Sequence, residues 1–566
     1  MTFDRCLICW SPQIRCSLQP MRRASKLCAF LALAVILLSH GFEATGTCQE
    51  KQDSAESAGL PVPARAKWRF GNYGSDLPNG YYRLAYSPDG KFIAARNRNN
   101  VVEVRDTKSR QLVCELSNHK LRIKWMEFSP DSKHLMTAST IDENVLIWNV
   151  QSARVVETIE CKPESVSFSQ AGNSIMILET EVVVGGHQVS SGRVLEYSWP
   201  ECQFKGQTPY RVNSEIRPVV SRDGRFMIVT QKFGNGRRTK LVDLENDSSL
   251  VLAGPPKAPK RVVFSDDNLW AAATYSYESQ VRLWNLGNPS RLNFTLNKHD
   301  QTVESVAFSP DNRFLVTTGK DKKVFLWDLV TRQPIAKLEG HSEYVISAAF
   351  SSVGSELVTG ASGLNDSTAI VWDLNKLLFP MPSKQVTKKS FPNEWKNLGS
   401  SLPAIALRSV NNLQASVDEV FGKLKFQLGN PMTASEDDIL KLIEQLDAET
   451  FKEREEATEK LKAVRGRSER ILLEALDDLP SSEVRYRIAQ ILKHSSSRPK
   501  INPAELRRLH RSIMLLELIS RQPTHKQSSI EILQVMSQNH PHLDVSRGAA
   551  SALDRISVRE KLAGDL

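Results

Sequence analysis

The sequence predicts a seven-bladed β-propeller with four strands in each blade, followed by a smaller α-helical domain. Two observations lead to this prediction. A short motif recurs seven times through the first two thirds of the chain, at spacings of 40 to 52 residues, and a repeat of this length with four short strands is typical of propeller blades. After Leu374 the β-type alternation stops, and apolar residues recur at helical spacing instead.

The first 46 residues predict a secretory signal peptide. A cationic stretch over residues 21–26 precedes an unbroken apolar run over residues 27–38, which is the usual order and size of such a signal. The run is shorter than the roughly 20 apolar residues that span a bilayer, so we expect cleavage after Gly46. The alternative is an uncleaved membrane anchor formed by residues 27–42. A cleaved signal implies an exported protein of the periplasm or cell envelope, or a secreted one.

The net charge makes nucleic acid an unexpected partner. The formal charge of +10 falls to about +7 without residues 1–46, which hold five basic and two acidic residues. A basic surface attracts nucleic acid, anionic lipid or acidic proteins. However, export separates the chain from nucleic acid, and the aromatic and basic residues do not alternate in the way that stacks bases. We expect contact with a membrane only through an uncleaved N-terminal segment.

Cysteine placement predicts free thiols. Four of the eight cysteines, including the Cys6 and Cys9 pair, lie within the first 46 residues. The pair has a redox or metal spacing but lacks the flanking strand and helix pattern that such a site needs. The other four are far apart in the sequence, so we expect buried thiols rather than a disulfide framework; they are Cys48, Cys114, Cys161 and Cys202.

Each repeat contains an apolar anchor residue followed by Ser and a turn. In the sixth repeat, β-prone runs precede and follow the sequence Pro310-Asp-Asn312, which predicts a hairpin loop there. A third run ends in Trp-Asp or Trp-Asn in four repeats, and a fourth run follows it. The seven anchors are Tyr86, Phe128, Phe168, Val220, Phe264, Phe308 and Phe350.

Three repeats resemble the WD-repeat family closely. Each has a His, then an Asp, then a Trp six residues after the Asp. In that family these residues, with a neighbouring Ser or Thr, form a buried hydrogen-bonded network that ties three strands of a blade together. The resemblance therefore implies a structural role for these histidines rather than a catalytic one. The residues are His119, Asp142 and Trp148; His299, Asp321 and Trp327; and His341, Asp366 and Trp372.

The last repeat lacks a fourth strand of its own. We expect the segment Trp68–Phe70 to supply it, as ring-closing strands do in the family, because closure removes two exposed sheet edges. The third and fourth repeats are irregular, since they end in Tyr197-Ser198 and Val242-Asp243 and lack the His. The third also carries an insertion at residues 185–188, which we expect to be a hairpin loop; a partner-binding loop is the alternative.

Helical spacing organises the rest of the chain. We place the propeller at residues 67–375, linkers at 47–66 and 376–391, and the helical domain at 392–566. This part resembles HEAT-like helical repeats, as in bacterial WD-repeat proteins with a helical C-terminal region. Its charged run at 452–456 is expected to be a solvated helix face, with a docking surface as the alternative. A pair of helices is expected within 392–427, a helix cap at Ser435–Asp438, and further helices over 451–464, 468–479, 483–492, 503–519, 529–536 and 545–556.

The sequence contains none of the searched motifs for a nucleotide, a zinc protease, a nucleophilic serine or covalent haem. Two carboxylate-rich stretches, Asp142–Asn144 and Asp266–Asn268, lie in predicted turns that favour Asp and Asn for backbone reasons. Calcium at these turns is the alternative. We therefore expect no catalytic residues, no metal and no cofactor.

The resemblance implies an interaction scaffold that binds a protein or peptide through the top face of the propeller, with the helical domain as a second contact surface. Two alternatives remain. Aromatic side chains gathered on one face would favour a carbohydrate-binding envelope protein, and a cluster of Asp, Glu or His around the channel would favour a propeller hydrolase. By alignment, the residues expected at the top face are Tyr82, Arg122, Lys124, Thr302, Glu304 and Tyr344.

Overall fold

A computed structural model describes residues 62–564 of the protein, with short gaps. The predicted signal peptide, Cys48 and the insertion at 185–188 lie outside the described residues, as does Ser435 of the expected helix cap. The gaps are residues 73–79, 170, 183–189, 213–215, 247, 287–292, 364, 379–381, 429–435, 464–470, 473–474, 477–480, 494–501 and 541.

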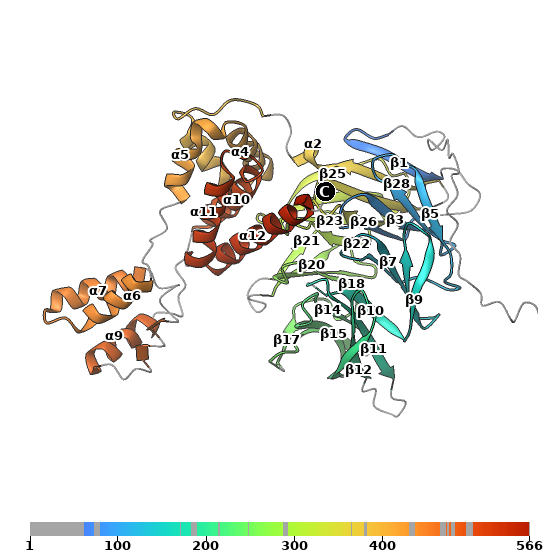
Figure 1. The fold of residues 1–566 in the computed structure, drawn as a ribbon, viewed down its shortest axis with the longest axis horizontal. Coiled ribbons are helices and arrows are strands. Elements are labelled where there is room, and N and C mark those ends of the chain that lie inside the picture. Colours follow the sequence, from blue (N-terminus) through green and yellow to red (C-terminus); the bar gives the residue numbers. More distant parts are fainter. Residues whose placement is uncertain are drawn as a thin grey trace, which may run out of the picture. The chain divides into compact units, whose positions relative to one another are not determined.

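Seven antiparallel sheets of four strands each form the described part of the propeller (Figure 1). The first three blades are built as follows: β2 (Arg83–Tyr86), β3 (Phe92–Arg96), β4 (Val102–Asp106) and β5 (Leu112–Leu116); β6 (Trp125–Phe128), β7 (His134–Ser139), β8 (Asn144–Asn149) and β9 (Arg154–Glu160); β10 (Pro163–Phe168), β11 (Ser174–Val182), β12 (Ser190–Ser198) and β13 (Phe204–Val212).

Blades 4 to 7 repeat the same order, and the last strand of blade 7 comes from the N-terminal side. Their strands are β14 (Ile216–Val220), β15 (Phe226–Phe233), β16 (Gly236–Asp243) and β17 (Ser248–Leu252); β18 (Pro259–Phe264), β19 (Trp270–Tyr275), β20 (Val281–Asn285) and β21 (Asn293–Leu296); β22 (Val303–Phe308), β23 (Phe314–Gly319), β24 (Val324–Asp328) and β25 (Gln333–Leu338); β26 (Tyr344–Phe350), β27 (Glu356–Ser362), β28 (Ser367–Asp373) and β1 (Ala66–Asn72).

The N-terminal strand closes the ring, which confirms the prediction made from Trp68–Phe70. Strand β1 pairs antiparallel with β28, with Phe70 opposite Ala369. The side chains of Trp68 and Phe70 are buried between the last and first blades. Both sheet edges that an open ring would expose are thereby paired.

The anchor turns share one backbone conformation. In the first blade, the Ser87 hydroxyl donates to Asp89 at 2.6 Å and accepts from the backbone N–H of Phe92 at 2.9 Å. The fourth residue after the anchor has a positive φ in every blade, a conformation that favours Gly and Asn. These residues are Gly90, Ser132, Gly172, Gly224, Asn268, Asn312 and Gly354.

The propeller core lies between neighbouring blades. The cluster between blades 5 and 6, for example, joins Leu283 of one sheet to Val306 and Leu315 of the next. Blades 3 and 4, whose repeats are irregular in sequence, are complete four-stranded sheets. They share an apolar cluster that joins Leu178 to Met227. Their cores form from alternating apolar residues without the Trp that ends the regular repeats.

Helices follow the propeller (Figure 1). Helix α10 begins at Pro503, directly after Asn502. The side chain of Asn502 caps the helix, because it accepts a hydrogen bond from the backbone N–H of Ala504 at 2.9 Å. None of the helices in the described residues has the length and apolar character to cross a membrane. Their bounds are α2 (Leu374–Leu378), α3 (Phe391–Leu398), α4 (Pro403–Ala415), α5 (Val417–Leu428), α6 (Glu436–Glu444), the short 3-10 helix η1 (Gln445–Asp447), α7 (Phe451–Ala463), α9 (Ser482–Lys493), α10 (Pro503–Ile519), α11 (Lys526–Asn539) and α12 (Leu543–Gly564).

The helix bounds correct several expectations. The pair of helices expected within 392–427 is wrong, because this stretch holds α3, α4 and α5. The expected linker also contains structure: its first residues belong to α2, and Val386 is buried with its N–H donating to the Ser416 hydroxyl at 2.8 Å. Helices α6, α7 and α9 share a cluster of their own with residues 471–472. HEAT-like stacking stays a prediction.

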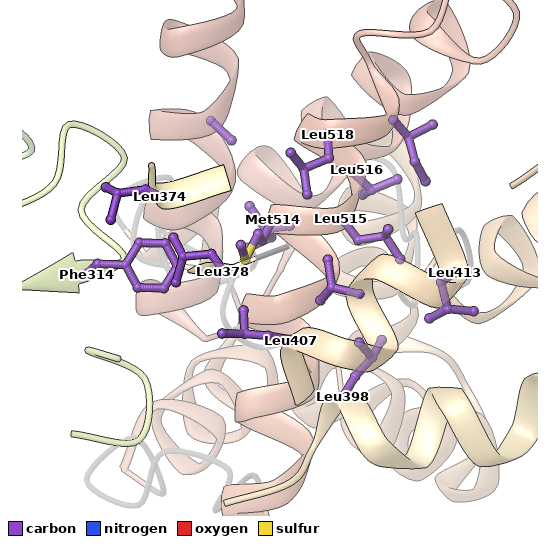
Figure 2. Close-up of a cluster of buried hydrophobic side chains, with 14 of the residues drawn as sticks. Phe314, Leu374, Leu378, Leu398, Leu407, Leu413, Met514, Leu515, Leu516 and Leu518 are labelled. Atoms are coloured by element: carbon purple, nitrogen blue, oxygen red, sulfur yellow. The ribbon is translucent and has the colours of Figure 1, made fainter. Parts of the chain in front are cut away.

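An apolar cluster joins the propeller to helices α3, α4 and α10. Figure 2 shows Phe314 of β23 and Leu378 of α2 next to Met514 of α10, with Leu407 of α4 below them. All four side chains are buried. Burying apolar area of this extent is the main term that holds such contacts together.

Candidate binding face of the propeller

The first strands of the blades surround the centre of the propeller. Strand β2 contacts β6 and β26, and β22 contacts β18 and β26. We call the end at which these strands begin the upper face, and the end that carries the anchor turns the lower face. The six residues expected at the top face lie at or next to the starts of β2, β6, β22 and β26, and therefore at the upper face.

A buried hydrogen-bonded network supports the upper face in three blades. In blade 6, the ring of His299 lies between Asp321 and Thr317, with Nδ1 2.9 Å from the carboxylate and Nε2 2.8 Å from the hydroxyl. Thr317 also accepts the indole N–H of Trp327 at 2.9 Å. Matching contacts join His119, Asp142, Thr137 and Trp148, and His341, Asp366, Thr359 and Trp372.

This network fixes the loop that leads into the innermost strand. The carboxylate of Asp366 accepts the backbone N–H of Ser342 at 2.9 Å, two residues before Tyr344. Burial disfavours the charged form of Asp366, but hydrogen bonds from His341 and Thr368 outweigh it and lower its pKa to about 2. A fully bonded polar set of this kind rigidifies its surroundings, so the structural residues position the upper face.

Two tyrosines lie close together where the last and first blades meet. The Ser362 hydroxyl donates to the Tyr82 hydroxyl at 3.0 Å, and Ser362 is also the strand partner of Tyr344. The guanidinium of Arg96 lies 5.0 Å from the centre of the Tyr82 ring. The side chain of Tyr344 is 43% exposed, so it offers an aromatic contact to a ligand.

Three lysines of the upper face are paired with carboxylates. Lys124 lies 3.7 Å from Glu164 and donates to Thr140 at 2.9 Å. Lys260 and Lys320 both contact Glu304. Glu304 and Lys124 therefore belong to local ion pairs, which are worth little in stability where they are exposed. Thr302, the remaining expected residue, contributes its carbonyl to the backbone N–H of Lys320.

Sequence reasoning missed three arginines near this face. Arg83 and Arg96 are strand partners in blade 1, and Arg261 lies on the first strand of blade 5. Burial and then the positive charges of Arg261, Arg96 and Arg122 lower the pKa of Arg83 well below its usual value, so each of these three groups lies within electrostatic reach of Arg83. The signal was present in the repeat: Arg83 and Arg261 stand three residues before their anchors, where blades 6 and 7 carry Ser305 and Ser347.

The lower face contacts the chain's own helices. Arg313 of blade 6 lies 2.7 Å from Glu517 of α10. Asp328, the acid that follows Trp327, forms an ion pair with Arg511 of α10, and both side chains are at most 2% exposed. A cavity of about 2450 Å³ opens between the anchor turns of all seven blades and the helices α10 and α12.

The described residues contain no group of three His, Cys, Asp or Glu placed to hold a metal ion. Of the turn carboxylates for which calcium was the alternative, Asp142 belongs to the His119 network and Asp266 lies 3.3 Å from Arg222. No disulfide joins the described cysteines of the propeller, of which Cys114 and Cys161 are buried.

Comparison with known proteins identifies the repeat. The family described as WD domain, G-beta repeat matches residues 110–149, 290–328 and 332–373. A WD repeat-containing protein WDS homolog of Arabidopsis thaliana is 20% identical over 304 residues, 53% of this chain and 56% of the relative. A WD repeat-containing protein 26 homolog of Drosophila melanogaster is 22% identical over 306 residues, 51% of this chain and 45% of the relative.

A shorter stretch is more similar to a third relative. A probable coatomer subunit beta' of Schizosaccharomyces pombe is 33% identical over 109 residues, which is 19% of this chain and 13% of the relative. The chain thus spans about half the length of the first two relatives and much less of the third.

Proposed function

We propose that this protein, whose residues 66–373 form a seven-bladed propeller of WD repeats, is a non-catalytic scaffold that binds a protein or peptide through its upper face. One observation carries the proposal: α10 engages the lower face through Arg511 and Glu517, which pair with Asp328 and Arg313, whereas the upper face presents Arg122 and Tyr344 as exposed side chains. Aromatic and Arg side chains are enriched where binding energy concentrates. The name of one relative, a coatomer subunit, is consistent with work inside an assembly.

Two further parts of the proposal concern the rest of the chain. The helices offer a second contact surface, for which exposed Phe426 and Tyr486 are candidates. The cationic and apolar segment over residues 21–38 supports export to the cell envelope. Residues 1–46 lie outside the described part of the chain, so this second part depends on sequence pattern alone.

Affinity capture from the protein's own cell envelope tests the upper face. The bait is the chain from residue 47, compared with a triple variant in which Arg122, Lys124 and Tyr344 are changed to Ala. The matched control variant changes two exposed cations and one exposed aromatic residue elsewhere on the propeller: Lys108, Arg154 and Phe204 to Ala.

The proposal expects one or more proteins that the unmodified bait and the control variant retain and the triple variant loses. Equal capture by all three baits would contradict binding at the upper face. Capture of glycans without protein would instead favour the carbohydrate-binding alternative.

A further inference from the structure

Four arginine side chains gather at the upper end of the channel from three different blades. Arg83 and Arg96 come from adjacent strands of blade 1, Arg122 from the loop before β6, and Arg261 from β18 in blade 5. Arg83, the first residue of β2, also lines the cavity between the anchor turns and helices α10 and α12. Because blades 1 and 5 are not neighbours, the positive charges surround the channel rather than form a flat patch on one blade.

Among the described residues, no carboxylate forms an ion pair with Arg83, Arg96 or Arg122. Arg96 is 3% exposed; it donates to Asn100 at 3.1 Å, and its Nε has no hydrogen-bond partner within the described chain. Arg261 donates to the Ser305 hydroxyl. Burial lowers the pKa of Arg261 to about 10 against the opposing effect of the Glu304 charge, and Glu304 already contacts two lysines.

This arrangement differs from the arginines near the lower face. Arg222 lies 3.0 Å from Glu127 and 3.3 Å from Asp266, and Arg313 lies 2.7 Å from Glu517. These two arginines of the lower face thus have carboxylate partners. At the upper channel, burial and then the charge of Arg122 lower the pKa of Arg96 to about 10, and the described residues supply no carboxylate ion pair to Arg83, Arg96 or Arg122.

We propose that the upper channel is a binding site for an acidic peptide segment of the partner, whose carboxylates pair with Arg83, Arg96, Arg122 and Arg261. This inference rests on the proposed function and names the chemistry of its ligand. Guanidinium groups bind carboxylates through two parallel hydrogen bonds. An extended peptide is narrow enough to present side chains to groups that surround a channel, and Tyr82 and Tyr344 flank the same mouth for apolar contacts.

A direct binding measurement tests the proposal without knowledge of the partner. The probe is fluorescein-labelled hexaglutamate, titrated with the chain from residue 47 and followed by fluorescence anisotropy. Labelled hexaglutamine is the neutral control probe. We expect saturable binding of hexaglutamate and no binding of hexaglutamine. Addition of 0.5 M NaCl should weaken the binding of hexaglutamate, because this salt concentration screens charges that are more than about 4 Å apart.

Two variants assign the site. Arg122→Gln removes an exposed side chain and leaves the fold intact, and we expect at least a fivefold rise in Kd. The double variant Arg83→Gln/Arg122→Gln is expected to raise Kd at least twentyfold, with folding checked by circular dichroism. Arg154→Gln, an exposed cation on the outer strand of blade 2, is the matched control and is expected to leave Kd unchanged.

Three results would overturn the proposal: no hexaglutamate binding, equal binding by the Arg122→Gln and Arg154→Gln variants, or stronger arginine-dependent binding of polygalacturonate, which would assign the channel to an acidic polysaccharide. The experiments distinguish failure of this inference from failure of the proposed function. If the captured proteins depend on the upper face but hexaglutamate does not bind, the scaffold function stands and the acidic ligand is wrong. If hexaglutamate binds but the captured proteins do not depend on the upper face, the acidic-ligand site stands and the proposed scaffold function of the upper face is wrong.

Discussion

Arg313, in the lower turn of blade 6, lies 2.7 Å from Glu517 in helix α10, although 204 residues separate them in the sequence. Arg555 of α12 contacts the same carboxylate at 2.9 Å. Glu517, a buried acid of α10, therefore contacts both the propeller and α12. The helices thus occupy part of the lower face, which is why the binding surface that we propose is the upper one.

Glu517→Gln is expected to destabilise the protein. The change leaves Arg313 and Arg555 without their shared negative charge, and breaking a buried charge network by removing one partner costs about 3 kcal/mol. Chemical unfolding at pH 7 measures the loss. Glu531→Gln, an exposed position on α11, should have no effect; equal losses in the two variants would contradict the account.

The stabilisation from Glu517 should depend on pH. Burial disfavours its charged form, but the charges of Arg313 and Arg555 outweigh burial and lower its pKa from 4.5 to about 2. Since the folded state favours the ionised carboxyl, the stabilisation is fully present above about pH 4.5 and is lost as pH falls toward 2. The difference in unfolding free energy between the native chain and Glu517→Gln should shrink over that interval. A constant difference would show that the pKa is not lowered.

Two adjacent threonines of β23 should respond in opposite ways to the same substitution. Thr317→Val removes the hydroxyl that His299 and Trp327 share, and we expect a loss of about 2 kcal/mol because buried polar groups lose their partner. Thr318 is equally buried, but its hydroxyl has no hydrogen-bond partner in the described residues, so Thr318→Val should be neutral or stabilising. Thermal unfolding of both variants checks this contrast.

Ring closure should depend on the apolar side of β1. Phe70→Ala empties a buried position between the last and first blades and is expected to cost about 3 to 4 kcal/mol. Lys67→Ala removes an exposed ion pair with Glu356 and should cost less than about 1 kcal/mol. Similar unfolding midpoints for the two variants would mean that β1 does not close the ring.

The crowded arginines should weaken the free protein. Arg83→Met removes one of four like charges and keeps an apolar side chain in the channel, so we expect a gain of about 1 kcal/mol in the free energy of unfolding, together with loss of hexaglutamate binding. Arg222→Met removes a cation that Glu127 and Asp266 neutralise and should destabilise. Unfolding titrations of both variants, with native-like circular dichroism as the control, measure the contrast.

The repeat made the propeller predictable because its signals are local. The anchor Ser, the turn Asp and the Trp each act within one blade, so seven copies predict seven sheets and even the closing role of Trp68–Phe70. Arg511 and Glu517 gave no such signal. Their partners Asp328 and Arg313 lie 183 and 204 residues away in the sequence, and a charge on a helix is more often solvated than buried.

The candidate site was predicted in part. The alignment brought Arg122, Lys124 and Tyr344 to the starts of the first strands, but it could not tell that Glu164 neutralises Lys124. Arg83 and Arg261 were missed because a lone Arg in a β-strand pattern carries no sign of the neighbours it meets across a channel. Their shared position three residues before the anchor was the available clue.

Site-specific photo-crosslinking tests the central claim most directly. The exposed aromatic side chain of Tyr344 at the upper face, or that of Phe204 on the outer strand of blade 3, is replaced by p-benzoylphenylalanine, and each protein is irradiated in its own cell envelope. The account predicts a discrete crosslinked partner at Tyr344 that excess hexaglutamate displaces, and none at Phe204. A partner that crosslinks at Phe204 and not at Tyr344 would contradict the claim that the upper face is the binding surface.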